Sequence, residues 1–304
     1  MNSTTSENVQ SVVKVKSLAE KAILLSINVG VFSVNKKDKK QSQETANNVG
    51  GSTDYIRVNK SLLRNKATAA VLSFSQKMRL EFYSKTAAWG SDGFRIVKIG
   101  NYTKVKSELE ENIRKFNDLV NDACAEYQNI IDFNFQDERA ALGNMFNRAD
   151  YPSISAFRSA FYAKVNVEPV KTDDFRSGTL SNEDIAEINN SINERINDAI
   201  KNSEMDVLTR VNEKLQHLSS RLLDSDSKFH TSNVTNVCEI IREMKELNIN
   251  DNPKISEALE KVESQICGLD AENIRESNSA RNNALDKTKD AISTISAAME
   301  DFTF

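Results

Sequence analysis

Apolar residues recur at helical spacing along the C-terminal part of the chain. Two runs step by three and four residues, which is heptad spacing and indicates helices that each bury one narrow seam. The runs are Ile185, Ile188, Ile192, Ile196 and Ile200, followed by Leu208, Val211, Leu215, Leu218 and Leu222. Further helices are expected around Ile241 and Leu259, and a last, more polar one runs to the C-terminus. Residues 176–304 are therefore predicted to form an acidic antiparallel helical hairpin or bundle.

Capping residues mark the ends of these helices. Asp251 or Asn252 is placed to cap a helix that begins at Pro253, since proline is favoured at the first helical position. Gly268 follows the last apolar residue of that helix and is expected to end it. Asp270 is expected to cap the last helix.

The N-terminal half mixes helical and extended patterns. Residues 1–15 are polar and are expected to be a flexible tail, and residues 36–53 an exposed loop. The apolar, β-branched stretch Ala22–Phe32 leaves both a helix and a buried strand open. Helical periodicity covers Val58–Trp89 and Val105–Ile131, and extended patterns cover Phe94–Ile99 and Val165–Val170.

Composition agrees with a helical fold. Nine glycines and three prolines in 304 residues are too few for the frequent turns of a β-sandwich or barrel. We predict a mainly α protein, an elongated helical bundle with coiled-coil-like antiparallel helices and a small extended or β element in the N-terminal half. Its predicted parts are the tail at 1–15, a mostly helical domain at 16–175 and the acidic helical domain at 176–304.

The stretch Ala87–Val105 holds the only tryptophan, Trp89, and three of the nine glycines. Gly90 and Gly93 bracket Ser91–Asp92, a composition that favours a turn with positive φ. A structural turn between a helix and a short extended segment is the favoured interpretation. A ligand-binding loop is the alternative.

Charge is divided between the two ends of the chain. Residues 1–115 carry 20 Lys and Arg against 10 Asp and Glu, whereas residues 116–304 carry 20 against 34, which gives the net charge of −4. The basic part is a candidate contact for nucleic acid or for an acidic protein. A solvated charged segment is the simpler interpretation. The candidate basic contact residues are Lys36, Lys37, Lys39 and Lys40.

Motifs of known chemistry are missing from the sequence. It has no phosphate-binding glycine loop, no HExxH, no CxxC pair and no GxSxG. No catalytic residue, metal site or cofactor is assigned, and catalysis is the minority hypothesis. The three scattered cysteines suggest a reducing compartment, and no apolar run is long enough to span a membrane, so we expect a cytoplasmic protein. The His and Cys residues that match no zinc spacing are His217, His230, Cys238 and Cys267.

Several short motifs occur in an order that resembles one protein family. They are LSINVGVF, DYIRVNKSLL, AAWGSDGFRIV, FNRADYPSISAFRSAFY and MKELNINDNPKISEAL. Over most of its length the chain resembles an uncharacterised family of bacterial, plasmid and phage proteins, a domain of unknown function. Members are often encoded near MoxR-like AAA+ ATPases and von Willebrand factor A proteins that resemble cobalt-chelatase subunits, which implies an adaptor in an ATPase-driven remodelling system. The landmark positions, without assigned roles, are Trp89, Gly93, Arg95, Asp150, Tyr151, Pro152, Asn248 and Pro253.

The lead interpretation is a non-enzymatic helical interaction or adaptor protein of a bacterial host cell, or one that a phage encodes. An AAA+ ATPase or a von Willebrand factor A protein is the expected partner, and self-association is an option. The alternatives are a nucleic-acid-associated phage or plasmid protein that uses the basic part, and a virion or assembly component. The candidate docking residues are those of the second heptad run, Leu208, Val211, Leu215, Leu218 and Leu222.

If the basic part binds nucleic acid, the affinity depends on its lysines and on salt. Replacing Lys36, Lys37, Lys39 and Lys40 with glutamine then lowers the affinity and flattens its dependence on salt, because fewer counterions are released from the phosphates. An electrophoretic mobility-shift assay measures both effects. The absence of any shift at low salt would contradict this interpretation.

Overall fold

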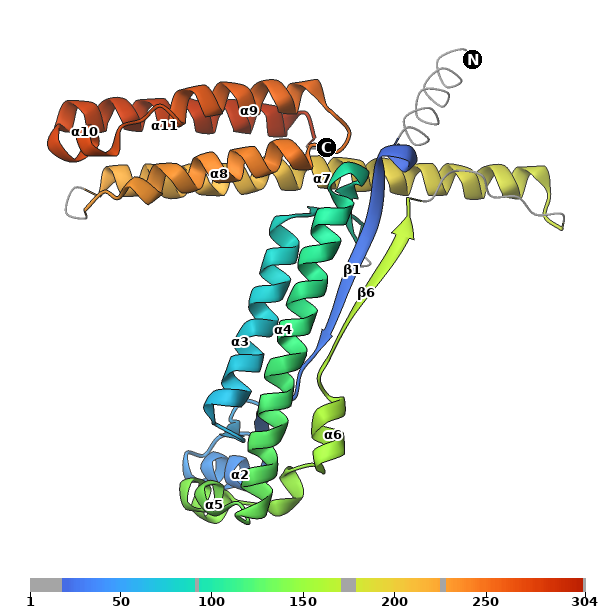
Figure 1. Ribbon diagram of the computed structural model, residues 1–304, viewed down its shortest axis with the longest axis vertical. Coiled ribbons are helices and arrows are strands. Elements are labelled where there is room, and N and C mark those ends of the chain that lie inside the picture. The colour runs from blue at the N-terminus through green and yellow to red at the C-terminus, as the bar shows by residue number, and fades with distance from the viewer. Residues whose placement is uncertain (1–17, 91–92, 171–178, 225–227, 303–304) are drawn as a thin grey trace. The chain divides into compact units, whose positions relative to one another are not determined.

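The computed structural model describes residues 18–90, 93–170, 179–224 and 228–302 (Figure 1). Helices dominate these residues, and a small sheet uses strands of the N-terminal half, so the predicted fold class is confirmed. None of the helices in these residues combines the length and the apolar content that crossing a membrane requires.

The chain forms two compact units that are discontinuous in sequence. Unit 1 comprises Met1–Ser26, Tyr83–Val105 and Asn166–Phe304, and unit 2 comprises Ile27–Phe82 and Lys106–Val165. The boundary predicted near residue 175 does not divide them, because Tyr83–Val105 belongs with the C-terminal helices. Contacts between segments so far apart in sequence leave no local periodic signal.

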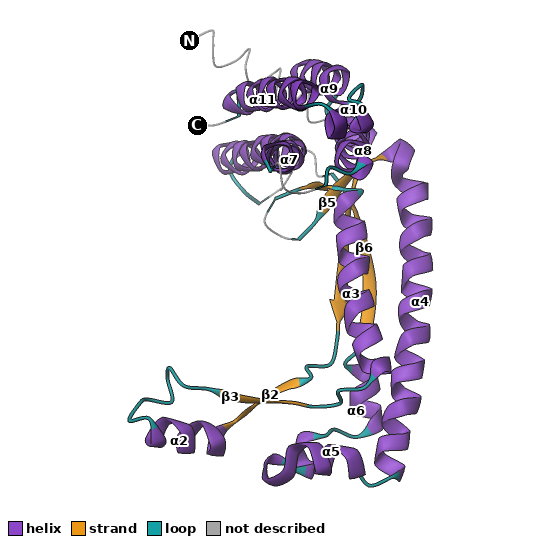
Figure 2. Ribbon diagram, turned by 90° about the vertical axis from the view of Figure 1, so that its left-hand side faces the viewer, coloured by secondary structure: helices purple, strands orange, loops and turns teal. Residues whose placement is uncertain are grey.

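A bundle of four long helices forms the largest part of unit 1. Helix α7 (Asn182–Leu223) packs against α8 (Thr231–Leu247) and α11 (Asn278–Glu300), and α9 (Pro253–Ile266) also packs against α8 and α11. The short helix α10 (Ala271–Glu276) connects α9 to α11. Figure 2 looks nearly along these helices. Each helix therefore has two neighbours, as the short connections of an up-and-down bundle require.

The helix ends follow the capping signals of the sequence. The Asn252 side chain accepts a hydrogen bond from the backbone of α9, and Pro253 occupies its first turn, as predicted. Asp270 caps the short helix α10, and Ser277 caps α11 separately. The last helical region is therefore two helices, whereas the sequence indicated one.

The second heptad run forms the core of the bundle. Its five residues are at most 3% exposed and lie in one cluster with apolar residues of α8, α9 and α11. They stabilise the bundle of this chain, and a partner would reach them only if the bundle opened. A docking surface therefore has to be sought elsewhere than at the candidate docking residues Leu208, Val211, Leu215, Leu218 and Leu222.

A four-stranded sheet has the order β4–β5–β1–β6, with β4 at Ala87–Ala88, β5 at Arg95–Lys98, β1 at Ala22–Gly30 and β6 at Tyr162–Pro169. Strand β5 pairs antiparallel with both β4 and β1, and Ile96 lies opposite Ala87 on one side and Leu24 on the other. The extended segments predicted around β5 and β6 are confirmed, and the apolar stretch after residue 22 is a strand.

Unit 2 contains most of α3 (Lys66–Ser84) and α4 (Ile99–Asp132) and an aromatic cluster. The Tyr127 and Phe157 ring centroids are 4.5 Å apart, and the Tyr127 hydroxyl donates to the Pro152 carbonyl at 2.7 Å. The ring of such a buried tyrosine packs against apolar neighbours, while its hydroxyl group forms a hydrogen bond. The other elements here are α5 (Gln136–Leu142), α6 (Ile154–Ser159) and the 3₁₀ turns Gly143–Met145 and Arg148–Asp150.

Residues 36–53 are not the exposed loop that their polar composition predicts. Strand β2 (Asn35–Asp38) pairs antiparallel with β3 (Val58–Ser61), and α2 (Lys39–Asn48) follows β2 directly. The Asp38 side chain caps α2 by accepting a hydrogen bond from Gln41 N at 3.0 Å. The helix buries only Ser42 and Ala46, so it has too few apolar residues to show helical periodicity.

A disulfide between Cys238 and Cys267 joins α8 to the end of α9, whereas Cys124 is free. The expectation of reduced cysteines is therefore wrong for this pair. The two residues are 29 positions apart, a spacing that by itself indicates no pairing.

Reducing this disulfide is expected to destabilise unit 1. In the chain-entropy model, a cross-link that closes a loop of this size contributes about 3–4 kcal/mol to the free energy of unfolding. Urea unfolding with and without a phosphine reductant measures the loss. Cys124→Ser should leave the effect of the reductant unchanged, and an unchanged urea midpoint in the native chain would contradict the cross-link.

Truncating the bundle core is expected to cost far more than truncating the surface of the same helix. Leu215→Ala should lower the free energy of unfolding by roughly 2–5 kcal/mol, because Leu215 is fully buried and its removal leaves a cavity. Leu223→Ala is the matched control, since Leu223 is 64% exposed on the same helix. Equal losses in chemical denaturation would contradict this assignment of core and surface.

Candidate functional site

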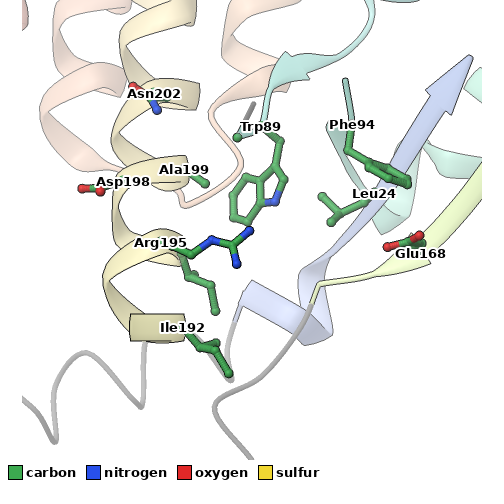
Figure 3. A pocket seen from close by; sticks show the side chains of 11 residues that line it. Leu24, Trp89, Phe94, Glu168, Ile192, Arg195, Asp198, Ala199 and Asn202 are labelled. Carbon is green, nitrogen blue, oxygen red and sulfur yellow. The ribbon is translucent and has the colours of Figure 1, made fainter. Parts of the chain in front are cut away.

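An apolar pocket of about 360 Å³ lies on unit 1 between α7 and the sheet. Its aromatic wall is formed by Trp89 and Phe94, and Ile192 of α7 lies across from them (Figure 3). All three side chains are partly buried and pack against the core of unit 1, so they are held in place while one face stays accessible. The volume falls within the range of small-ligand pockets, and the same space accepts one large apolar side chain. We call this the Trp89 pocket; its other lining residues are Leu24, Gly90, Glu168, Arg195, Ile196, Asp198, Ala199 and Asn202.

Polar side chains surround the mouth of the Trp89 pocket. Figure 3 shows the Arg195 side chain extending from α7 toward the Trp89 ring, and Glu168 on the opposite side near Phe94. The polar lining residues of α7, Arg195, Asp198 and Asn202, are exposed to solvent. The pocket therefore combines an apolar interior with charged groups of both signs at its rim, which is the arrangement of a binding site with orienting polar contacts.

The turn after Trp89 has the backbone that the sequence predicts. Gly90 and Gly93 have φ angles of 58° and 77°, in the left-handed region that glycine adopts without strain. The ligand-binding alternative for this turn rests on Ser91 and Asp92, which lie outside the described residues.

The Asp206 carboxylate of α7 holds the two strands that carry the aromatic wall. Its Oδ2 atom accepts hydrogen bonds from Ala88 N at 2.8 Å, from Arg95 Nη2 at 3.2 Å and from Arg210 Nη2 at 2.7 Å. Arg210 Nε also donates to Oδ1 at 3.0 Å, so this pair is bidentate. Trp89 directly follows Ala88 in the chain. The carboxylate therefore fixes the aromatic wall against α7.

The two arginines of this clamp also donate to backbone carbonyls in the last turn of α3 and just after it. Arg210 donates to the carbonyls of Tyr83 at 2.9 Å and Thr86 at 3.1 Å. Arg95 donates to the Thr86 hydroxyl and carbonyl at 2.6 and 2.7 Å, and its guanidinium lies 4.8 Å from the Tyr83 ring centroid. Burial and the neighbouring Arg210 lower the pKa of Arg95, and Asp206 opposes this change. The Asp206 carboxylate thus pairs with two partly buried cations.

Part of this site is predictable from the sequence: Trp89 and Arg95 are landmark positions, and Ile192 lies on a predicted helical seam. Asp206 and Arg210 carry no comparable signal, because an acid and a base four residues apart occur on many solvated helix faces. Their importance depends on the strands that pack beside them.

In unit 2 the structure places Lys36 in an ion-pair cluster. Lys36 and Lys60 are directly opposite each other on β2 and β3, a repulsive arrangement for like charges. Asp150 lies between them, with Oδ1 2.9 Å from Lys36 Nζ and Oδ2 2.6 Å from Lys60 Nζ. Lys60 also contacts Asp38 at 3.1 Å and donates to the Met145 carbonyl at 2.8 Å. The cluster therefore ties the turn before Asp150 to the two strands.

Charge pairing sets the pKa values in this cluster. Burial alone would lower the pKa of Lys60, but hydrogen bonds and charge from Asp150 and Asp38 outweigh it and raise that pKa. Burial alone would raise the pKa of the Asp150 carboxyl. Hydrogen bonds and charge from Lys60 and Lys36 outweigh burial, so the pKa is lowered. Hydrogen bonds from Gln41 N and Lys60 lower the pKa of Asp38.

The four candidate basic contact residues have different surroundings. Lys36 is bound to Asp150, and Lys40 lies 3.9 Å from Glu44. All four lysines, including Lys37 and Lys39, are exposed to solvent. The run is therefore partly neutralised by carboxylates of its own unit.

Other landmark positions of the family resemblance also make structural contacts. Asn248 is 3% exposed, and its amide donates to Asn252 O and Ser256 Oγ, both at 3.0 Å, which builds the turn between α8 and α9. The Tyr151 hydroxyl donates to Glu138 at 2.6 Å. Burial and this carboxylate raise the pKa of Tyr151.

The structure provides no group of three or more His, Cys, Asp or Glu side chains arranged for a metal ion within the residues it describes. His217 and His230 are exposed, and Cys238 is bonded to Cys267. No protein-family model matches the chain, and neither curated proteins nor solved structures gave a match. The family resemblance of the sequence motifs therefore stays an expectation.

Replacing Arg210 with lysine is expected to loosen the clamp. The substitution keeps the charge but removes the bidentate contact with Asp206 and the reach to two carbonyls, and it should lower the free energy of unfolding by roughly 2 kcal/mol. Trp89 emission should shift to longer wavelength as the aromatic wall becomes more mobile. Arg221→Lys, on the exposed side of α7, is the control. Unchanged emission and stability in R210K would contradict the role of the clamp.

The ion-pair cluster is expected to make unit 2 sensitive to acid. A carboxyl whose pKa is lowered on folding contributes stability above its unfolded pKa and loses that contribution as the pH falls through the lowered value. The free energy of unfolding should therefore fall below about pH 4, the pKa of an unperturbed Asp. Asp150→Asn should reduce this slope, whereas Asp54→Asn, an exposed residue of the same unit, should not. Equal slopes in urea titrations across this pH range would contradict the pairing.

Proposed function

We propose that this chain is a non-enzymatic helical interaction protein and that its Trp89 pocket receives an apolar side chain of a protein partner. The observation that carries this proposal is the accessible aromatic pair, Trp89 and Phe94, held on two clamped strands beside α7. Because the pocket is already formed, its side chains lose little conformational freedom when a partner residue enters. Binding there therefore costs less entropy than binding to a mobile surface.

The residue types of the pocket support a protein partner. Tryptophan and arginine are enriched among the residues that dominate protein interfaces, and such residues sit in apolar pockets surrounded by polar groups. Trp89 and Phe94 form the apolar wall, and Arg195 stands at the rim. The motif resemblance names the first partners to test, an AAA+ ATPase or a von Willebrand factor A protein.

A photo-crosslinking residue at the pocket rim tests this function in the full chain. Asn202 is an exposed lining residue, so a benzophenone amino acid at this position should crosslink to the partner in the native cell. Leu80 is 68% exposed on α3 of unit 2 and is the matched control position. We expect a specific product at position 202, weakened at least severalfold by Trp89→Ala and absent at position 80.

The captured protein is then purified and titrated against the native chain while Trp89 emission is followed. Trp89 is the only tryptophan of the chain, so its emission reports on the pocket when a partner without tryptophan is used or when the partner's emission is subtracted. A saturable change with a one-to-one endpoint is the expected result. Crosslinking that is equal at both positions, or binding that leaves Trp89 emission unchanged, would count against the proposal.

A further inference from the structure

The apolar face of α7 continues beyond the Trp89 pocket toward the start of the helix. Ile192 lines the pocket, and Ile188 and Ile185 follow at steps of four and three residues, so the three share one face. All three are half-buried. The helix is well formed up to its first turn, because Ser181 and Asp184 make a capping box there. We call Ile185, Ile188 and Ile192 the isoleucine stripe.

This part of α7 extends past the bundle partners of the helix. Helix α7 has 42 residues, whereas α8 has 17 and α11 has 23. The core of unit 1 includes Ile196 and Ile200 of α7, but most of the core residues that α7 contributes lie later, from Val207 to Leu222. The isoleucine stripe and the pocket therefore lie on the portion of α7 with the least cover from the other bundle helices.

The charges beside the isoleucine stripe have one dominant sign. Residues 182–200 contain five Asp and Glu and one Arg, and no Lys. Glu187 and Asp198 are among the exposed acidic residues of this segment. A ligand that lies along the stripe is therefore favoured when it carries positive charge, and its approach is accelerated by the field of these carboxylates.

We propose that a basic amphipathic helix of a partner protein docks along the isoleucine stripe and places one large apolar side chain in the Trp89 pocket. This inference rests on the proposed function and specifies the chemistry of the partner. Ile185 and Ile192 are seven residues apart, about 10.5 Å along a helix. A partner helix matches that length with apolar residues at positions i, i+3 or i+4, and i+7, which is the usual helix-in-groove pattern.

A second copy of the stripe is a poorer occupant. In a pair of identical stripes, each acidic segment would face the same acidic segment of the other copy. Like charges along paired helices are destabilising. An isolated small molecule would fill the pocket but would leave the outer part of the stripe, at Ile185 and Ile188, without a partner. Charge and length together select a basic helix.

Two synthetic peptides of about 18 residues, or five helical turns, test the proposal on the full chain. Both have leucines at helical spacing and no tryptophan, and the remaining positions are Lys and Arg in one peptide and Glu in the other. The basic peptide should change Trp89 emission in a saturable way, with an affinity that weakens as salt rises from about 50 to 200 mM. The acidic peptide should bind at least roughly tenfold more weakly.

Charge reversal on α7 provides the decisive comparison. The double variant Glu187→Lys and Asp198→Lys should weaken binding of the basic peptide at least roughly tenfold and strengthen binding of the acidic one. The double variant Glu257→Lys and Glu260→Lys makes the same change in net charge on exposed positions of α9 and should leave both affinities near those of the native chain. Circular dichroism establishes that both variants are folded. A separate variant, Ile188→Ser, should weaken the basic peptide without changing its salt dependence.

Each other outcome overturns the inference in a distinct way. Equal binding of both peptides would show an apolar groove without charge selection, and equal effects of the two charge-reversal variants would show that net charge alone is sensed. If light scattering shows a dimer of the native chain and Ile188→Ser abolishes that dimer, the stripe is occupied by a second copy of this chain. If neither peptide binds while the protein crosslinked at position 202 still changes Trp89 emission, this inference fails and the proposed function stands. If the crosslinked protein also leaves Trp89 emission unchanged, this inference and the proposed function both fail.

Discussion

The Asp206 carboxylate is the interaction on which the accessible part of unit 1 depends. It receives hydrogen bonds from the backbone of β4 and from two arginines, one of which also donates to the Tyr83 carbonyl in the last turn of α3. The arginine and aspartate side chains are 14–23% exposed, so the pairs are shielded from water and respond weakly to salt. Without this carboxylate, two neighbouring guanidinium groups would lose the anion that both of them hydrogen-bond, and breaking such a pair costs more than a paired contact gains. The position of Trp89 follows directly from this constraint.

The two parts of the long helix α7 have different surroundings. Its later residues form the closed core of the bundle, where Leu208 and Leu215 are fully buried. Its earlier residues carry the isoleucine stripe and one side of the Trp89 pocket. Both parts have heptad spacing, and spacing alone does not distinguish a seam that is filled by the same chain from one that stays accessible. The lengths of the neighbouring helices make that distinction.

Unit 2 uses its charges internally. Asp150 separates two lysines that the pairing of β2 and β3 brings face to face, and the turn that carries Asp150 is tied to the aromatic cluster through Tyr151 and Pro152. The density of lysine at residues 36–40 therefore overstates the positive surface that this region offers to a nucleic acid. The three consecutive landmark residues each make a structural contact: Asp150 pairs with two lysines, the Tyr151 hydroxyl donates to Glu138, and the Pro152 carbonyl accepts from Tyr127.

Local structure could be predicted from the sequence wherever one signal was strong. Heptad spacing placed the bundle helices, Asn252, Pro253 and Asp270 marked the helix ends, and the glycines on either side of residues 91–92 indicated a turn with positive φ. Prediction failed for α2, whose apolar residues are too few to show a period, and for the disulfide, since a separation of 29 residues gives no pairing signal. The packing of the elements was needed to show which seam is core, which segments make up each unit, and that Asp206 and Arg210 hold Trp89 beside α7. The clamp depends on contacts between residues more than a hundred positions apart, and the core seam depends on contacts between separate helices, whereas periodicity describes only neighbours along the chain.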